Sequence, residues 1–133
     1  MEQDELLRFA VDVLDRLRIP YVGVTESMAS IMFGEPRLTN DIDIVVRLPA
    51  DRAGEFCSQF PDNDFYVSVD AARDAIRSQS MFNVIHPTSG LKIDFILAKS
   101  TPFGRIQLER GRRMQFGDSA PHEAQFCSPE DII

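Results

Sequence analysis

The N-terminal segment has the hydrophobic spacing of an amphipathic helix. Within residues 4–18, apolar side chains recur at the i, i+4, i+7, i+8 and i+11 positions that share one helical face: Leu6, Ala10, Val13, Leu14 and Leu17. Pro20 cannot continue a helix, and the apolar run at residues 21–24 that follows it predicts a short buried strand.

The clearest strand pattern in the chain lies at residues 41–48. Every second residue of this segment is apolar and would face one side of a sheet: Ile42, Ile44, Val46 and Leu48. Asp41, Asp43 and Val45 would then face the opposite side. The alternation therefore predicts a strand with one buried face and two carboxylates on the other.

The segments around that strand carry helical patterns. Clusters of apolar residues predict helices at residues 27–33, 50–60 and 70–79. Gly34 is well placed to end the first of these helices in a left-handed conformation, which glycine adopts without steric penalty.

Two further strands are expected to form a hairpin. Residues 81–86 and 91–97 have strand patterns, and the Pro-Thr-Ser-Gly segment between them is rich in turn formers. Beyond Pro102 the pattern weakens and allows two short strands, near 112–116 and 124–127. This order of strands and helices favours an α/β fold of the α+β type, with helices packed on a mixed sheet.

Length and composition are those of one globular domain. The chain has 133 residues, of which 44% are hydrophobic and 26% are charged, so a single hydrophobic core is expected. The sequence contains no apolar run of about 18 residues, as a membrane-spanning helix would need. Residues 1–5 are acidic, unlike a signal peptide, and a cytoplasmic location is the default expectation. The two cysteines, Cys57 and Cys127, are expected to be reduced thiols.

The charge balance restricts the partners of this chain. Its formal net charge is -7, so it would bind nucleic acid poorly unless metal ions or a local basic patch offset that charge. One basic stretch is present: Arg105, Arg110, Arg112 and Arg113. It could contact a nucleic-acid or protein acceptor, but a solvated face that offsets nearby acids is the commoner role of such a stretch.

The paired aspartates at the start of the 41–48 strand are the first candidate for chemistry. Asp41 and Asp43 leave the strand on the same face, about 6–7 Å apart at ~3.3 Å per residue. Two carboxylates at this spacing repel one another and resist burial, and a divalent ion between them removes both penalties. The alternative is a pair of solvated acids at a strand end.

A third carboxylate has a compatible position. Asp94 alternates with Ile93 and Phe95 in the 91–97 strand, so it faces away from the apolar side, as Lys92 does. An acid in the middle of such a strand is costly unless it has a partner. If this strand neighbours the 41–48 strand, Asp94 completes a cluster of three acids.

A phosphate-binding element is suggested where the 21–24 strand runs into the predicted helix near Ser27. A helix N-terminus offers free N–H groups and partial positive charge to an anion. Thr25 and Ser27 add hydroxyl groups there, and Arg37 precedes the aspartate pair. Many strand–turn–helix units bind nothing, so this feature gains weight only beside the aspartates.

Together these residues resemble the nucleotidyltransferase superfamily. The family pattern is a strand, a Gly-Gly or Gly-Ser turn, a helix, Asp-x-Asp on the next strand and a lone acid on a later one. Residues 21–30, residues 34–46 with their Gly-Glu-Pro-Arg-Leu-Thr-Asn-Asp-Ile-Asp motif, and residues 92–95 match it. The resemblance covers roughly residues 19–98 and is strongest with a small bacterial branch that includes toxins of AbiEii-type toxin–antitoxin systems.

The resemblance implies a nucleotidyltransferase-type mixed β-sheet flanked by helices, and a reaction. Asp41 and Asp43 would bind Mg²⁺ (or Mn²⁺) and triphosphate, while Asp94, also a metal ligand, would help to activate the attacking hydroxyl. That hydroxyl would attack the α-phosphorus of a nucleoside triphosphate and release pyrophosphate, with metal ions stabilising the entering and leaving oxygens. The acceptor could be RNA, a protein or a small molecule, and a toxin-like member would have an antitoxin partner.

The C-terminal residues fit the same family. Ser128-Pro129-Glu130-Asp131 is a helix-start signature, yet the sequence stops at Ile133. Family members often have a following helical domain that helps to hold nucleotide and acceptor. We therefore expect residues 1–133 to be a nucleotidyltransferase-like core that lacks a C-terminal helical part; the alternative is a frayed tail.

One residue departs from the family pattern. Glu26 stands before Ser27 where the family has glycine, and it brings a negative charge to the expected position of the triphosphate. A like-charge contact at 4 Å costs about 1–4 kcal/mol, which would weaken nucleotide binding roughly tenfold to a thousandfold. We expect Glu26→Gly to tighten nucleotide binding in a calorimetric titration; an unchanged affinity would remove Glu26 from consideration.

Three interpretations stay open at this point. The first is a metal-dependent nucleotidyltransferase. The second is a catalytically inactive domain of the same fold that binds nucleotide, metal or a protein partner, which Glu26 favours. The third is a phosphodiesterase or nuclease that uses the same acids, which the turn before Ser27 disfavours because a hydrolase needs no triphosphate cradle.

Overall fold

The computed structural model describes residues 2–24, 41–116 and 122–126. Within these ranges, no helix is both long enough and apolar enough to cross a membrane. The helix predicted at residues 27–33 and its terminating Gly34 lie outside the described residues, as does Cys127.

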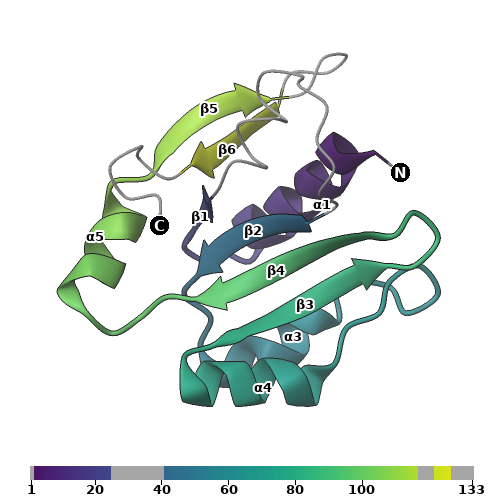
Figure 1. Ribbon diagram of the computed structural model, residues 1–133, viewed down its shortest axis with the longest axis horizontal. Coiled ribbons are helices and arrows are strands. Elements are labelled where there is room, and N and C mark those ends of the chain that lie inside the picture. Colours follow the sequence, from purple (N-terminus) through teal and green to yellow (C-terminus); the bar gives the residue numbers. More distant parts are fainter. Residues whose placement is uncertain (1, 25–40, 117–121, 127–133) are drawn as a thin grey trace.

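A mixed sheet of six strands forms the centre of the structure, in the order β3-β4-β2-β1-β6-β5 (Figure 1). The strands are β1 (Tyr21–Val24), β2 (Asp41–Val46), β3 (Met81–His86), β4 (Leu91–Leu97), β5 (Arg112–Phe116) and β6 (His122–Phe126). The central pair β2–β4 is parallel and so is β1–β6, whereas β1–β2, β3–β4 and β5–β6 are antiparallel. The predicted mixed sheet with packed helices is therefore confirmed.

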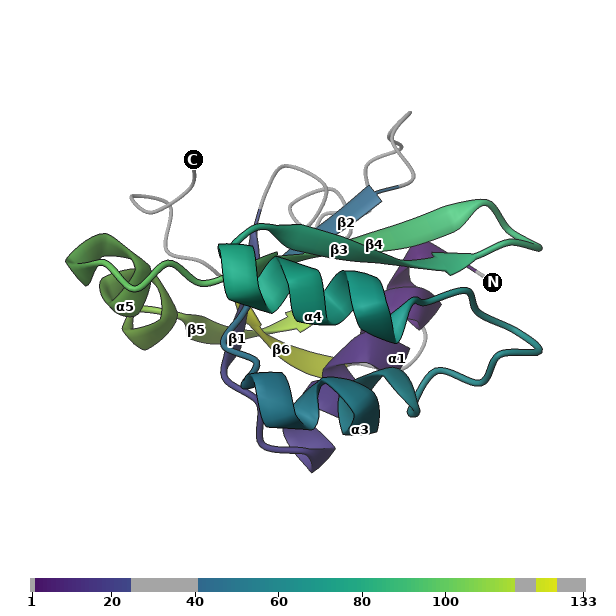
Figure 2. The ribbon, with the colours of Figure 1, turned by 90° about the horizontal axis from the view of Figure 1, so that it is seen from below.

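Helices cover one face of the sheet. The helical elements are α1 (Gln3–Arg16), the 3-10 helix η1 (Ala50–Arg52), α3 (Ala53–Cys57), α4 (Val69–Ser78) and α5 (Pro102–Glu109). Helices α1, α3 and α4 lie on the same side of β2, β3 and β4, whereas α5 lies beyond one end of these strands (Figure 2). The opposite side of β2 and β4 is therefore free of these three helices.

Local signals in the sequence fix the ends of the helices. The backbone N–H of Glu2 donates to Glu5 Oε1 at 3.0 Å and starts α1 with a capping box. Ser68 caps α4 by accepting from the N–H of Ala71 at 3.1 Å, and Gln79 ends that helix in the left-handed region with φ 52°.

The main core lies between the sheet and these three helices. Phe56 of α3 is at its centre and is 1% exposed. Its ring contacts those of Phe60, Phe82 and Phe95, with centroids 5.4, 6.2 and 5.1 Å away. Because the three partners come from different parts of the chain, this aromatic cluster joins α3 to β3 and β4 and fixes where these strands lie.

Some predicted boundaries differ from those observed. The first helix ends at Arg16 rather than residue 18, since Arg18 takes a positive φ of 57° that breaks the helix. The helix predicted at 50–60 is a 3-10 turn followed by α3, which ends at Cys57. The hairpin strands 81–86 and 91–97 are confirmed at both ends.

Helix α5 was not predicted, although its signal is present in the sequence. Thr101 accepts a hydrogen bond from the N–H of Gly104 at 3.1 Å, and Pro102 occupies the first turn. A capping threonine followed by proline is a helix start, but the eight residues of α5 are too few to display a clear apolar period.

Candidate active site

The parallel strands β2 and β4 give the sheet two unlike faces. On the helix-covered face Ile42, Ile44 and Phe95 are each 0% exposed. On the opposite face the side chains alternate with these buried ones, and Asp43 and Asp94 are only partly buried. The alternation predicted for both strands is confirmed, and the carboxylates lie on the face that α1, α3 and α4 leave free.

Strand pairing brings the carboxylates together. Asp43 is the direct register partner of Asp94 across the parallel β2–β4 pair. Adjacent strands lie about 4.8 Å apart, so these two side chains are immediate neighbours on one face. Asp41, two residues before Asp43, shares that face and is the register partner of Lys92. The adjacency that spacing alone could not establish is thus present.

Two neighbouring side chains bind the outer carboxylates. Asn83 of β3 pairs with Asp94, and its Nδ2 donates to Asp94 Oδ1 at 2.9 Å. Lys92 Nζ lies 3.7 Å from Asp41 Oδ2, a loose ion pair in which both side chains are 39% exposed. A row of polar residues therefore runs across three strands, from Asn83 of β3 through Asp94 of β4 to Asp43 of β2.

Asp43 is a carboxylate of this cluster whose pKa is clearly raised. Its pKa is raised to about 6, chiefly by burial and then by repulsion from Asp94, a hydrogen bond with Asp94 and repulsion from Asp41, while Lys92 opposes these effects. At neutral pH the carboxylate is still mostly ionised. The site thus concentrates negative charge, and among the described residues the ammonium group of Lys92, in a loose ion pair with Asp41, offsets part of it.

The chemistry of these donors suits a hard divalent cation. Carboxylate oxygens are the ligands that Mg²⁺ and Mn²⁺ prefer, and a cation would relieve the repulsion that raises the pKa of Asp43. Across the described ranges, however, no three acidic, histidine or cysteine side chains converge as a ready set of ligands for one ion. Asp41 lies toward Lys92 while Asp43 and Asp94 share a hydrogen bond, so binding an ion needs Asp41 to leave the ammonium group.

Beyond the carboxylates the same face becomes apolar. Val22 and Val45 form a second, smaller cluster, against which Ile96, Ala98 and Leu108 of α5 pack. Val45 and Ile96 are register partners, two residues further along their strands than Asp43 and Asp94. The polar row is therefore bounded on one side by an apolar surface that α5 completes.

The predicted nucleotide-binding residues Thr25, Ser27 and Arg37, together with Glu26, lie outside the described residues. What the structure does place is the strand that leads to them. Val24, the last residue of β1, is the register partner of Asp43. The chain therefore leaves β1 beside the carboxylate pair.

Two other side chains that can take part in catalysis, those of His86 and Cys57, have structural surroundings. His86 ends β3, where its Nδ1 lies 2.7 Å from Ser89 Oγ and its ring contacts Phe65. Cys57 is a free, buried thiol whose pKa is raised to about 11, chiefly by burial, although the charge of Arg73 opposes this. Both properties make Cys57 a poor nucleophile.

Asn83, which contacts Asp94, is a site residue that the sequence analysis missed. Its signal was the hairpin itself. If His86 and Leu91 pair across the turn, counting back three residues on β3 and forward three on β4 places Asn83 opposite Asp94. The register of the predicted hairpin therefore implies the contact between Asn83 and Asp94.

This chain was compared with protein-family models, with curated protein sequences and with solved structures. No protein-family model matches the chain. Nor does any curated protein sequence. A solved structure, the complex of a CCA-adding enzyme with ATP, matches with 22% sequence identity and a TM-score of 0.48, over 72% of this chain and 20% of that one. The match spans about a fifth of the length of that chain.

Proposed function

We propose that this chain is a metal-dependent nucleotidyltransferase, which transfers a nucleoside monophosphate from a nucleoside triphosphate to a hydroxyl group and releases pyrophosphate. The observation that carries the proposal is the pairing of Asp43 with Asp94 on adjacent parallel strands, with Asp41 on the same face. Three carboxylates on the sheet face opposite to α1, α3 and α4, one of them with a raised pKa, are an arrangement expected of a reactive site.

Asp41, Asp43 and Asp94 are the residues that would hold Mg²⁺ or Mn²⁺. When bound, the ion would offset the charge of the triphosphate and stabilise the oxygens that enter and leave at the α-phosphorus. Asp43 lies between the other two carboxylates and is the most strained of the group, so we expect it to contribute most to ion binding.

Asp94 is proposed to accept the proton of the attacking hydroxyl. Its Oδ1 already accepts from Asn83 Nδ2, which helps to fix the orientation of the carboxylate. In the proposed step, the hydroxyl oxygen forms a bond to the α-phosphorus and its proton goes to Asp94. The bond between the α-phosphorus and the oxygen that bridges it to the β-phosphorus breaks. The β- and γ-phosphates leave together as pyrophosphate.

Thr25, Ser27 and Arg37 are proposed to bind the triphosphate. Support comes from β1, whose last residue, Val24, pairs with Asp43, so residue 25 follows directly in the chain. Hydroxyl and guanidinium groups in this part of the chain would provide hydrogen bonds and positive charge to a ligand of high negative charge. Such groups matter in a chain with a net charge of -7.

A labelling experiment separates this activity from its alternatives. The protein is incubated with Mg²⁺, a candidate acceptor, and triphosphate labelled either at the α- or at the γ-phosphorus. Nucleotidyl transfer places only the α-label on the acceptor and releases the γ-label as pyrophosphate. Transfer of the γ-label, or cleavage of a phosphodiester without added triphosphate, would contradict the proposal and favour a phosphotransferase or a nuclease.

The second candidate is a catalytically inactive domain of the same fold that binds nucleotide, metal or a protein. The ion pair between Lys92 and Asp41 favours it, because it partly neutralises the carboxylates without any metal. Nucleotide binding without α-label transfer to any acceptor selects this candidate. Lys92→Ala distinguishes the two further, since an active site limited by this ion pair would bind metal more tightly in that variant.

The biological setting is also a proposal. The resemblance noted in the sequence suggests a toxin with an antitoxin partner and an acceptor that is RNA, protein or a small molecule, and the acidic residues 1–5 suggest a cytoplasmic location. Expression of the chain should then arrest growth, and Asp43→Asn should restore it if the arrest depends on the carboxylates.

A further inference from the structure

A pocket lies at the far end of the central strands from the carboxylates. It has a volume of about 410 Å³, and the last residues of β2 and β4, Val46 and Leu97, form part of its wall. These residues are three positions beyond Asp43 and Asp94, which corresponds to about 10 Å along the strands at ~3.3 Å per residue. The pocket is therefore separate from the carboxylate row.

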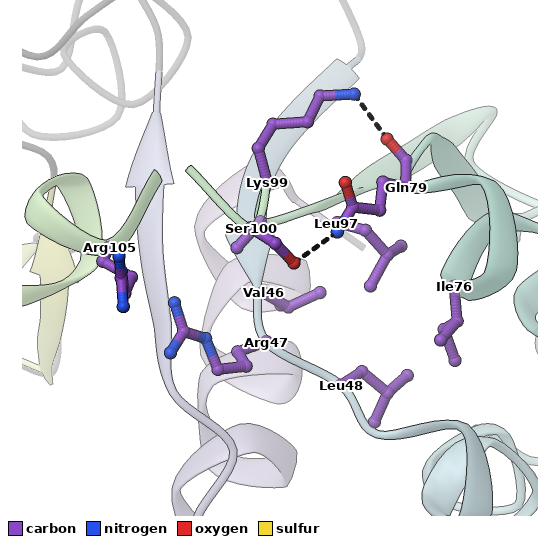
Figure 3. Close-up of a pocket in the computed structure, with 10 residues that line it drawn as sticks. Val46, Arg47, Leu48, Ile76, Gln79, Leu97, Lys99, Ser100 and Arg105 are labelled. Atoms are coloured by element: carbon purple, nitrogen blue, oxygen red, sulfur yellow. Dashed lines mark hydrogen bonds between the residues drawn. The ribbon is translucent and has the colours of Figure 1, made fainter. Parts of the chain in front are cut away.

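The lining of this pocket is basic. Arg47, Lys99 and Arg105 all contribute to it, and none of its described lining residues is acidic. The chain as a whole has 21 acidic and 14 basic residues, so a pocket with this balance opposes the general charge of the protein. Figure 3 shows Arg47 and Arg105 toward one side of the pocket, across from Gln79 and Ile76.

The two arginines are available for an anion. Each is exposed, and among the described residues neither forms an ion pair with an acid. Two arginines of nearby helical segments differ in this respect, because Arg77 pairs with Asp74 and Arg52 pairs with Glu55. Two unpaired guanidinium groups on one pocket repel each other, and a shared anion would remove that repulsion.

The rest of the polar rim is held in place by hydrogen bonds. Lys99 Nζ donates to the carbonyl oxygen of Gln79 at 2.5 Å, and Gln79 Nε2 donates to Ser100 Oγ at 2.6 Å (Figure 3). Gln79 ends α4, where backbone carbonyls carry partial negative charge, so Lys99 offsets the helix terminus. The Ser100 hydroxyl accepts from Gln79 and keeps its own proton to donate.

The opposite wall is apolar. Leu48, Ile76 and Leu97 line it together with Val46 and Ala98. A pocket of this volume, with a few directed polar groups beside an apolar wall, is of the kind that holds small ligands. A ligand with an anionic group at the arginines and a less polar group against Ile76 would match both parts.

We propose that this pocket binds a phosphate group, with Arg47 and Arg105 as its principal ligands and the Ser100 hydroxyl as a further donor. Guanidinium groups present paired N–H donors that match phosphate oxygens, which favours a phosphate over a monovalent inorganic anion. The phosphate could belong to a small phosphorylated compound or to a nucleic-acid backbone. The proposal does not depend on the activity assigned to the carboxylates.

The test is an NMR titration of the whole chain with inorganic phosphate, and a parallel titration with sodium chloride at matched ionic strength. We expect phosphate alone to shift the amide signals of residues 46–48 and 97–105. Arg47→Ala and Arg105→Ala should each weaken phosphate binding about tenfold, the effect of losing one charge-assisted hydrogen-bonding group. Arg77→Ala is the matched control, because it removes the same charge from α4 outside the pocket lining.

Three results would overturn the proposal: no phosphate-specific shifts at the pocket, equal shifts with chloride, or an affinity that falls as much in Arg77→Ala as in the pocket variants. Titration with glycerol phosphate and with a short single-stranded oligonucleotide then identifies the source of the phosphate. Both should shift the same residues, and the compound that binds more tightly than inorganic phosphate gives the ligand class. Loss of the signal in Asp43→Asn would contradict the independence of the two sites.

Discussion

Asp43 is both a candidate metal ligand and a carboxylate whose ionisation destabilises the fold. Its carboxylate has a pKa of about 6, against an ordinary value of 3.8, because of burial and of its two acidic neighbours. The folded protein thus holds the proton more tightly than the unfolded chain does. The protonated Asp43 carboxyl therefore stabilises the folded state at low pH, and this contribution is lost as the pH rises from about 4 to about 6.

The first prediction is that Asp43→Asn stabilises the metal-free protein at pH 7. The amide keeps the size of the side chain and removes the charge, which should raise the free energy of unfolding by about 1 kcal/mol after allowance for solvent screening. Urea unfolding measures this effect. Asp62→Asn, at an exposed loop position, is the control and should change stability little. A destabilised Asp43→Asn protein would indicate that the carboxylate is a structural group.

The second prediction concerns the pH dependence of metal binding. An ion needs the deprotonated carboxylate, so protons compete with Mg²⁺ or Mn²⁺ for Asp43. We expect affinity to be nearly constant above pH 7 and to fall about tenfold for each pH unit below about 6. Titration of Mn²⁺ by electron paramagnetic resonance at several pH values measures this. An affinity that is flat down to pH 5 would exclude Asp43 as a ligand.

At the scale of single elements, α5 depends on a close approach of two backbone segments. A Cβ at Gly104 would lie 2.3 Å from the carbonyl oxygen of Lys99, closer than any side chain can come. Helix α5 carries Leu108 against the Val22–Val45 cluster and Arg105 to the basic pocket. The position of Gly104 therefore affects both the Val22–Val45 cluster and the basic pocket, which lie toward the same end of β2 and β4.

The third prediction contrasts two helical glycines. Gly104→Ala should lower the free energy of unfolding by more than about 1 kcal/mol, although alanine is the better helix former. Gly54→Ala in α3 is the matched case, since its nearest neighbour would be the Arg73 side chain at an ordinary 3.7 Å. It should gain about 0.5–1 kcal/mol from helix propensity. Chemical denaturation of both variants decides, and the account fails at this scale if both substitutions stabilise.

Most elements could be predicted because their patterns are local. The hairpin followed from alternation and a turn, and the two faces of β2 followed from the positions of Ile42, Ile44 and the aspartates. What could not be predicted was the neighbour of each strand, because a 3-10 helix, two α-helices and a strand separate β2 from β4 in the sequence. The third carboxylate was therefore conditional until the register paired Asp43 with Asp94.

Short helices, and pockets lined by residues from several segments, were harder to predict. Helix α5 has only eight residues, so its capping signal at Thr101 carried all the information. The basic pocket joins residues from β2, α4 and α5 with those after β4, and no single segment contains its pattern. Arg105 belonged to a basic stretch in the sequence, but Arg47 and Lys99 joined it only through the fold.

At the scale of the whole molecule, the residues of the core and the residues of the candidate site lie on opposite faces of the sheet. The aromatic core around Phe56 lies on the helix side, whereas the carboxylate row lies on the opposite face. Substitutions in the row should therefore change binding without unfolding the protein. The net charge of -7 adds a further condition, because a triphosphate approaches a negative protein only when cations or local basic groups offset the repulsion.

The most direct test of the central claim is a calorimetric titration of the four nucleoside triphosphates into the protein, with and without Mg²⁺. We predict binding that requires Mg²⁺, prefers certain bases, and is lost or weakened by at least about tenfold in Asp43→Asn and in Asp41→Asn, while Asp62→Asn binds as the wild type does. Binding that is independent of Mg²⁺, or equal in the wild type and in Asp43→Asn, would contradict the assignment of these carboxylates as a metal-dependent nucleotide site.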